Sequence, residues 1–313
     1  MAGKLSPEEL KKYIFPYRGA FRSEVLAGPG IGEDAAVIDR GGEYVYVSSD
    51  PIVGAAEHIG KLLIDININD IAVKGGDPNY IVLTLLVPEK LGLQFIEQTM
   101  KDIHERALRY DMAVIGGHTE ITNAYEKPVV SATIIGSGKH AYSCSRAKLG
   151  DAVLLIGDVA LEGAYIIYST HPEQFADVFT DDEKIELNGF ADILCIYPYA
   201  QLIREHVLFM HDPTEGGVMG GLAELDALLP GKGIAFSGTI SLHPIVKKLT
   251  DRIGARAGNL ISSGSLLAIV DASLVTVVTE ILAANKISCQ HIGNIADKSN
   301  FTTDTSEELW KFI

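Results

Sequence analysis

The chain has 313 residues, of which 47% are hydrophobic, and its formal net charge is −15 at pH 7. This length exceeds the usual size of one hydrophobic core, so we expect two domains. The negative charge argues against binding of nucleic acid through a basic surface, but it allows a nucleotide ligand because Mg²⁺ can mediate between carboxylates and phosphates.

Two observations bear on the cellular compartment. The longest apolar run, residues 80–87, is too short to cross a bilayer, and the N-terminal stretch MAGKLSPEELKKY has no apolar signal core. Cys144, Cys195 and Cys289 are widely spaced and form no CxxC pair. This pattern suits a reducing compartment and excludes a cysteine-rich zinc site. We expect a soluble cytoplasmic protein that binds neither nucleic acid nor a membrane.

The first half of the chain alternates between strand and helix patterns. Ser6, Pro7 and Glu9 predict the N-cap, the first helical position and the capping-box partner of an opening helix. Apolar residues at helical spacing predict a second helix in IDININDIAVKGGDP, residues 64–78, which ends at the Gly-Gly pair. The other elements expected here are strands over 44–49, 80–87, 113–115 and 129–135 and a helix over 95–110, an order typical of an α/β domain.

The second half begins after a polar stretch without periodicity, residues 136–151, which predicts a linker. In MHDPTEGGVMGGLAEL, Asp212, Pro213 and Glu215 predict the N-cap, first position and capping-box partner of a helix that reaches Leu225. We expect further strands over 152–156, 234–237, 266–270 and 287–292 and helices over 162–168, 182–194 and 274–284. We therefore predict a second α/β domain over 147–313, after a first domain over 1–140.

The second helix carries polar residues inside its apolar pattern. Asn67, Asp70 and Lys74 are three and four residues apart and so share one face. This face is either solvated or it holds a ligand. Asn67 and Asp70 are short side chains one turn apart, which suits a hard cation or a phosphate better than the Glu and Lys residues of an ordinary exposed face.

Four acidic residues lie at strand ends, in glycine-rich turns or on this helix face, namely Asp34, Asp50, Asp70 and Glu120. Ligands bind at strand ends and the following turns in open α/β folds. Clustered carboxylates repel one another, and Mg²⁺ with phosphate oxygens supplies a suitable counter-charge. The alternative for each residue is a role as a cap or turn residue.

Glycines in two turns are candidates for contact with a ligand. Gly30, Gly32, Gly116 and Gly117 allow close approach of a backbone, and free N–H groups there can cradle anions, although ordinary turns need glycine as well. The chain has neither a P-loop motif nor a convincing dinucleotide-binding fingerprint.

A second glycine cluster lies at the predicted helix start in the second half. Gly216 and Gly217 are followed by Gly220 and Gly221, and a helix N-terminus is a natural phosphate site. The alternative is tight packing of the helix against a sheet.

Two histidines lie in these glycine-rich motifs. His118 and His211 suit acid–base chemistry or metal binding, or they are hydrogen-bonded structural residues. Cys144 has no recognisable partner base, which favours an inert thiol.

Taken in chain order, the motifs GIGEDAAVI, SSD, NINDIAVKGGDP, GGHTE, HDPTEGG and SSGSLL resemble those of the PurM-like, AIR synthase-related ATP-dependent proteins. The HypE-like branch is the most similar, through Gly-Glu-Asp-Ala-Ala, Asp-Pro-Thr-x-Gly-Gly and Ser-Gly-Ser-Leu-Leu. The resemblance covers nearly the whole chain. It implies two α/β domains with mixed sheets, a homodimer formed through the N-terminal domains, and ATP bound near that interface.

The resemblance also implies roles for individual residues. Asp34, Asp50 and Asp70 match the family's acidic ligands of Mg²⁺–ATP, and Asn67 matches the Asn of its Asn-x-x-Asp helix motif. Its phosphate-side turn is matched by Gly116, Gly117 and Thr119. We expect ATP-dependent activation or phosphorylation of an amide, a carbonyl or another small acceptor, with Asp212, Gly216 and Gly217 of the second domain on the acceptor side.

Three departures from the family pattern affect the expected reaction. His118 stands where HypE and the thiamine kinase carry Asp, so that Glu120 supplies the missing carboxylate or one metal is lost. The sequence ends EELWKFI with no cysteine after Cys289, so we do not expect the HypE reaction on a terminal cysteine. The N-terminus lacks the catalytic Cys of selenophosphate synthetase. The alternative to an enzyme is a nucleotide-binding dimer without turnover, acting as a maturation or scaffold protein.

Overall fold

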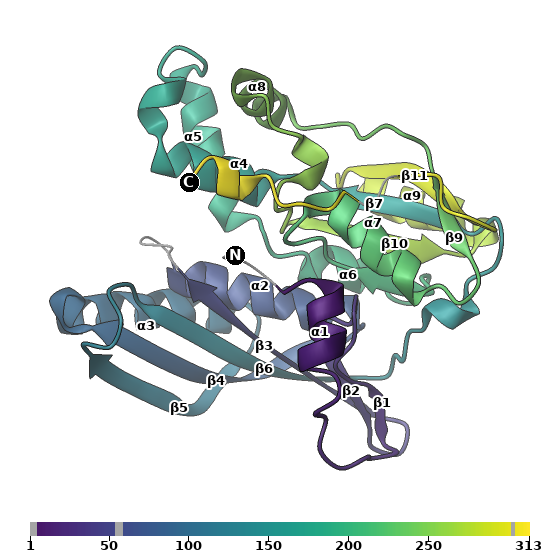
Figure 1. Cartoon of the computed structure of the whole chain (residues 1–313), viewed down its shortest axis with the longest axis horizontal. Coiled ribbons are helices and arrows are strands. Elements are labelled where there is room, and N and C mark those ends of the chain that lie inside the picture. The colour runs from purple at the N-terminus through teal and green to yellow at the C-terminus, as the bar shows by residue number, and fades with distance from the viewer. Residues whose placement is uncertain (1–4, 54–58, 302–303) are drawn as a thin grey trace. The chain divides into compact units, whose positions relative to one another are not determined.

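The computed structural model describes residues 5–53, 59–301 and 304–313 (Figure 1). The chain forms two compact units. Unit 1 comprises Met1–Ser23, Ala27–Glu33 and Tyr142–Ile313, and unit 2 comprises Glu24–Leu26 and Asp34–Ala141. The glycine-rich turn before Asp34 therefore belongs to unit 1, whereas Asp34 itself belongs to unit 2.

Unit 2 is built on a six-stranded mixed sheet with the order β1-β2-β3-β6-β4-β5. Strand β6 pairs antiparallel with β3 and β4, whereas β4 and β5 run parallel. Helices α2 and α3 pack on one face of this sheet (Figure 1). The elements are β1 (Val25–Ala27), β2 (Ala36–Asp39), β3 (Tyr44–Val53), α2 (Ile59–Val73), β4 (Asp77–Pro88), α3 (Gly92–Arg109), β5 (Ala113–Thr122) and β6 (Val129–Gly138).

The two faces of this sheet differ in burial. Side chains alternate along β4 and β6, so that Ile81, Leu83 and Ile134 are buried on the face that carries the helices. Val82 and Leu86 lie on the opposite face and stay half-buried. The sheet thus presents apolar side chains on a face that the described helices of unit 2 leave open.

Unit 1 contains a five-stranded sheet with the order β8-β10-β7-β11-β9, in which all four pairings are antiparallel. Every residue of β7 and β10 is buried, which indicates that both faces of the central strands are covered. The longer elements are α1 (Pro7–Tyr13), β7 (Ala152–Gly157), α4 (Leu161–Thr170), α5 (Asp181–Gly189), α6 (Tyr197–Ile203), β8 (Phe209–His211), α7 (Gly217–Leu228), β9 (Gly233–Phe236), α8 (Pro244–Ile253), β10 (Ser265–Val270), α9 (Val275–Ala284) and β11 (Cys289–Ala296).

Several local predictions are confirmed. The capping box of Ser6 and Glu9 is present at the start of α1, and α2 ends just before Gly75, whose φ is +81°. The mixed α/β, two-domain fold expected from the sequence is also confirmed. Within the described ranges, no helix combines the length and hydropathy that a bilayer crossing needs.

Two predictions about motif geometry are wrong. GGHTE is not a turn after a short strand, because β5 continues from Ala113 through Thr122. Asp212 is not the N-cap of a helix, because α7 begins at Gly217 with Gly216 as its N-cap in the left-handed conformation. The helix expected over 182–194 is shorter, since α5 ends at Gly189 and a short 3₁₀ turn follows.

Candidate functional site in unit 2

The polar face of α2 is buried, so the interpretation of a solvated face is wrong. Asn67 is 0% exposed. Its amide oxygen accepts the Asp50 N–H at 2.9 Å, and its amide nitrogen donates to the carbonyl oxygens of Leu63 at 2.9 Å and Asp50 at 3.3 Å. Asn67 therefore attaches β3 to α2 at the position of Asp50.

Asp70 lies one turn further along α2 and contacts the same strand. The Ser48 hydroxyl donates a hydrogen bond to Oδ2 of Asp70. One turn later, the ammonium group of Lys74 lies 3.7 Å from Oδ2 of Asp34, and both side chains are almost fully buried. A charge pair removed from water is screened little by salt. Consequently α2 and its end bring two acidic side chains and one fixed cation to one side of the helix.

Asp50 and Glu120 lie far apart within one chain. Asp50 is level with Ala132 of β6, Ala132 with Leu83 of β4, and Leu83 with Gly117 of β5. These three strand spacings amount to about 14 Å. Two ligands of one Mg²⁺ lie within about 4 Å of each other, because each is about 2.1 Å from the ion. Asp50 and Glu120 of one chain therefore do not share an ion.

The glycines of GGHTE serve the strand geometry of β5. The register of β5 against β4 shifts between Val114 and Gly116. Gly117 has a φ of +147°, and a Cβ there would lie 2.0 Å from the Leu83 carbonyl oxygen, whereas a Cβ at Gly116 would meet no atom within 4 Å. Gly117 is thus required by the approach of β4, and Gly116 is not.

The side chains that follow on β5 are exposed. Nε2 of His118 lies 3.3 Å from Oε2 of Glu120, with the two side chains 65% and 54% exposed. Thr119 is also exposed. Their predicted roles in catalysis, metal binding and phosphate binding stay predictions.

The glycine-rich turn before Asp34 is part of unit 1 and packs on α7. A Cβ at Gly32, whose φ is +73°, would lie 3.0 Å from the Leu228 side chain and 3.1 Å from the Glu224 carbonyl oxygen of α7. Gly30 lies against the side chain of Glu33. The geometry accounts for Gly32 by close packing, and a contact of either glycine with a cofactor stays a prediction.

The HDPTEGG motif connects β8 to α7 in unit 1. Asp212 directly follows β8 and is 2% exposed. At the start of α7, the Gly216 N–H donates to Oε2 of Glu307 at 2.6 Å, and a Cβ at Gly217 would lie 2.6 Å from the Gly258 and Leu260 carbonyl oxygens. Close packing therefore explains glycine at position 217, but the packing is on the Gly258 and Leu260 backbone and not on a sheet as the alternative had it. A ligand contact at Gly216 or Gly217 remains a prediction.

Sequence reasoning missed two charged residues, Asp65 in the core of unit 2 and the half-buried Glu307 in unit 1. Asp65 of α2 pairs with Arg106 of α3 at 3.1 Å, with side chains 0% and 8% exposed. The available signal was an acidic residue at a core-facing helical position, which requires a buried partner. Glu307 was missed because nothing in the local sequence links it to a helix start about 90 residues earlier.

The donor set around α2 is chemically suited to Mg²⁺–phosphate. Carboxylate oxygens of Asp34 and Asp70 and the hydroxyl of Ser48 are the hard oxygen donors that this ion prefers. Lys74 provides a positive charge next to Asp34, which suits a phosphate oxygen. The residues present in unit 2 therefore fit the predicted group, with Glu120 outside the set of a single chain.

Comparison with known proteins agrees with this fold. The profile "AIR synthase related protein, N-terminal domain" matches residues 32–137, and "AIR synthase related protein, C-terminal domain" matches residues 148–305. A putative hydrogenase expression/formation protein of Methanocaldococcus jannaschii is 26% identical over 279 residues, which is 85% of this chain and 79% of that protein. Thiamine-monophosphate kinase of Bacillus subtilis is 32% identical over 167 residues, 49% of this chain and 50% of the kinase.

Solved structures share the fold at low sequence identity. The complex of the hydrogenase maturation protein HypE with ATP superposes with a TM-score of 0.66 at 18% identity, covering 94% of this chain and 88% of HypE. AaThiL, complexed with AMPPCP and TMP, superposes with a TM-score of 0.71 at 17% identity, covering 86% of each chain. Because both domain profiles match in order and together span most of the chain, the protein belongs to the PurM-like, AIR synthase-related family, whose relatives include ATP-dependent enzymes.

Proposed function

We propose that the protein is an ATP-dependent, Mg²⁺-requiring enzyme that phosphorylates or activates an amide, a carbonyl or another small acceptor. The observation that carries the proposal is the arrangement around α2, where Ser48 bonds to Asp70 and Lys74 pairs with Asp34. ATP and its analogue AMPPCP are named in two relatives that share the fold. The kinase activity of a third relative supports phosphoryl transfer as the reaction class.

Different residues of unit 2 would bind the metal ion and the phosphates. Phosphoryl transfer depends mainly on positioning and on neutralisation of charge, which bound Mg²⁺ supplies at the phosphates. Asp34 and Asp70 offer the carboxylate oxygens that hold such an ion, and Lys74 adds a fixed positive charge beside Asp34. Asn67 holds the backbone of Asp50 in place through its hydrogen bonds, and its own contact with the nucleotide is part of the proposal.

The acceptor would bind to residues of unit 1. Asp212, buried after β8, and the start of α7 at Gly216 and Gly217 would orient the acceptor. His118 is exposed to solvent and lies beside Glu120 on β5. It would therefore serve as a base only where a substrate or a second subunit covers β5.

The proposal includes a homodimer through unit 2. Apolar side chains such as Val82 and Leu86 occupy the half-open sheet face, and the edge strand β5 exposes Val114, Ile115 and Ile121 by 42%, 56% and 43%. Contiguous exposed apolar side chains are typical of protein interfaces. In a dimer, Glu120 of one subunit would add a carboxylate to the site of the other, which a single chain does not achieve.

Turnover of ATP tests the proposal against its alternative. Purified protein is incubated with Mg²⁺–ATP, alone and with candidate carboxamides, carbonyl compounds and phosphate monoesters, and ADP is measured. We expect acceptor-stimulated ADP formation that is lost in Asp70→Asn and kept in Glu89→Gln, an exposed charge on the same unit. ATP binding without turnover for any acceptor would favour the nucleotide-binding scaffold. Full activity of Asp70→Asn would refute the site.

A further inference from the structure

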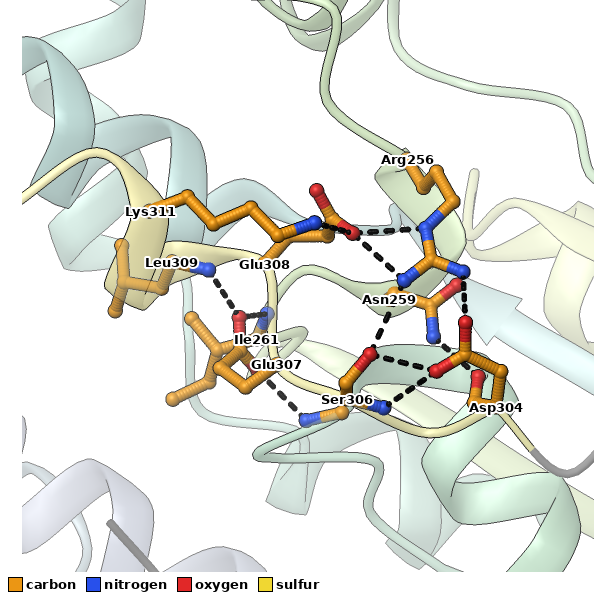
Figure 2. Close-up of polar contacts among 10 residues, drawn as sticks. Arg256, Asn259, Ile261, Asp304, Ser306, Glu307, Glu308, Leu309 and Lys311 are labelled. Carbon is orange, nitrogen blue, oxygen red and sulfur yellow. Dashed lines mark hydrogen bonds and ion pairs between the residues drawn. The ribbon is translucent and has the colours of Figure 1, made fainter. Parts of the chain in front are cut away.

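The last described segment of the chain, residues 304–313, forms a network of hydrogen bonds and ion pairs with the rest of unit 1 (Figure 2). Arg256 donates to Asp304 at 2.6 Å, to Glu308 at 2.8 Å and to Ser306 at 3.2 Å. The Asn259 amide donates to the Asp304 carbonyl oxygen at 2.7 Å. We call residues 304–313 the C-terminal segment.

Glu307 connects this segment to two loops of unit 1. Its carboxylate accepts the N–H groups of Gly216 at 2.6 Å, Ile261 at 3.2 Å and Leu309 at 2.8 Å. Figure 2 shows the contacts of Glu307 with Ile261 and Leu309. A Cβ at Gly216 would lie 2.7 Å from the Thr305 carbonyl oxygen. The C-terminal segment therefore lies directly across the start of α7.

A second glutamate is buried beside this contact. Glu162 occupies the first turn of α4 and is 5% exposed. Within the described part of the chain, Oε2 of Glu162 and Oγ of Ser263 are buried and neither atom forms a hydrogen bond. Ser263 nevertheless lies close enough to stabilise the carboxylate, and it lowers the pKa of Glu162 by less than burial raises it.

The charges that face Glu162 make its ionisation unfavourable. Burial raises the pKa of Glu162 to about 7, and repulsion from Glu307 on the C-terminal segment and Glu215 before α7 adds to the rise. The pKa of Glu307 is also raised, first by burial and further by Glu215. Two basic side chains on this side are paired with other carboxylates: Arg256 with Asp304 and Glu308, and Lys311 with Glu308. Ionisation of Glu162 therefore adds a further negative charge beside Glu307 and Glu215.

We propose that the C-terminal segment is a pH-sensitive strap, which stays docked across the start of α7 while Glu162 is protonated and loosens when Glu162 ionises and repels Glu307. Loosening frees the N–H groups of Gly216 and Ile261, which the strap otherwise occupies. The start of α7 is then open to another acceptor of hydrogen bonds.

The sign follows from linkage between protonation and docking. A carboxyl whose pKa is higher in the docked state binds its proton more tightly there, so docking is strongest in acid. Because repulsion from Glu307 raises the pKa of Glu162 only while the segment is docked, the docked state is favoured when Glu162 is protonated and loses stability as the pH rises through about 7. Asp304 acts in the opposite sense, but its pKa is lowered to about 2 by Ser306 and Arg256, so it stays ionised across this range.

The single tryptophan of the chain, Trp310, lies in the strap and is 50% exposed, so its fluorescence reports docking. Acrylamide quenching of Trp310 and deuterium uptake of the C-terminal segment, corrected for the intrinsic pH dependence of exchange, are measured on the full chain at about pH 5.5 and about pH 8. We expect the wild type to open roughly tenfold more at the higher pH, as a coupling of one pKa unit implies. Glu162→Gln should show the protected state at both pH values.

Two further variants distinguish this coupling from a general effect of charge. Glu280→Gln removes an exposed carboxylate of the same unit and should behave as the wild type. In a Glu307→Gln background, Glu162→Gln should have little further effect, because the repulsion is already gone. The proposal is overturned if the strap opens equally at both pH values in the wild type, or if Glu162→Gln opens with pH as the wild type does.

Discussion

Gly117 and Gly116 are adjacent glycines of one motif, yet the structure predicts opposite outcomes when each is replaced by alanine. A Cβ at residue 117 would lie 2.0 Å from the Leu83 carbonyl oxygen, whereas ordinary contact begins near 3.4 Å. The obstacle is backbone of the neighbouring strand, so the strands have to separate. Overpacking costs about 1–3 kcal/mol, and a φ reserved for glycine adds about 1–3 kcal/mol. We expect Gly117→Ala to destabilise unit 2 by about 4 kcal/mol.

Gly116→Ala is the matched control, because a Cβ there meets no atom within 4 Å and the backbone is not left-handed. We expect its effect on stability to stay within about 0.5 kcal/mol. Urea unfolding followed by circular dichroism gives the free energies, and amide exchange of residues 77–88 assigns the loss to β4. Equal stabilities of the two variants would refute the argument that close approach of β4 fixes Gly117. Because Gly116→Ala keeps the fold, a loss of ATP affinity in it would report ligand contact alone.

Three further outcomes follow from burial and charge. Asp65→Asn should lower the free energy of unfolding by about 3–5 kcal/mol in urea denaturation, because it leaves Arg106 buried without its counter-charge; a loss below 1 kcal/mol would contradict this. Burial raises the pKa of Cys289 to about 11, so iodoacetamide at about pH 8 should label it about 100-fold more slowly than an unhindered peptide thiol, and equal rates would contradict the burial argument. Since Ser306 and Arg256 lower the pKa of Asp304 to about 2, its contribution to strap docking is complete above its ordinary value of 3.8 and disappears as the pH falls toward 2. Trp310 fluorescence should show this acid transition in the wild type and lose it in Asp304→Asn.

The α2 helix shows how far sequence reasoning reached. Its periodicity and the Gly-Gly pair predicted its place and its end, and the short side chains of Asn67 and Asp70 marked its polar face as unusual. The partners of these residues lie on β3, which is a neighbour only in the folded chain. Pairing between strands was therefore needed to show that Asn67 holds Asp50 and that Ser48 holds Asp70.

Glycine-rich motifs were the weaker part of the prediction, because glycine is compatible with turns, bulges and close packing alike. GGHTE lies within a continuous strand, in which Gly117 follows the register shift with a φ that favours glycine, and no local signal in the sequence separates this from a turn. Asp212 and Pro213 satisfied a helix-start pattern, but Gly216 in the left-handed conformation delays α7 until Gly217. Close packing requires glycine at both residues, because Gly216 lies against Thr305 and Gly217 lies against Leu260.

Binding of Mg²⁺–ATP to the α2 site is the central claim, and calorimetric titration of the full chain measures it directly. The wild type should bind ATP only in the presence of Mg²⁺. Asp70→Asn keeps an acceptor for Ser48 but loses a charged contact worth about 1.5–3 kcal/mol, which predicts a fall in affinity of roughly 10- to 100-fold. Glu89→Gln should bind as the wild type. Equal Mg²⁺-dependent affinity of Asp70→Asn and the wild type would contradict the account.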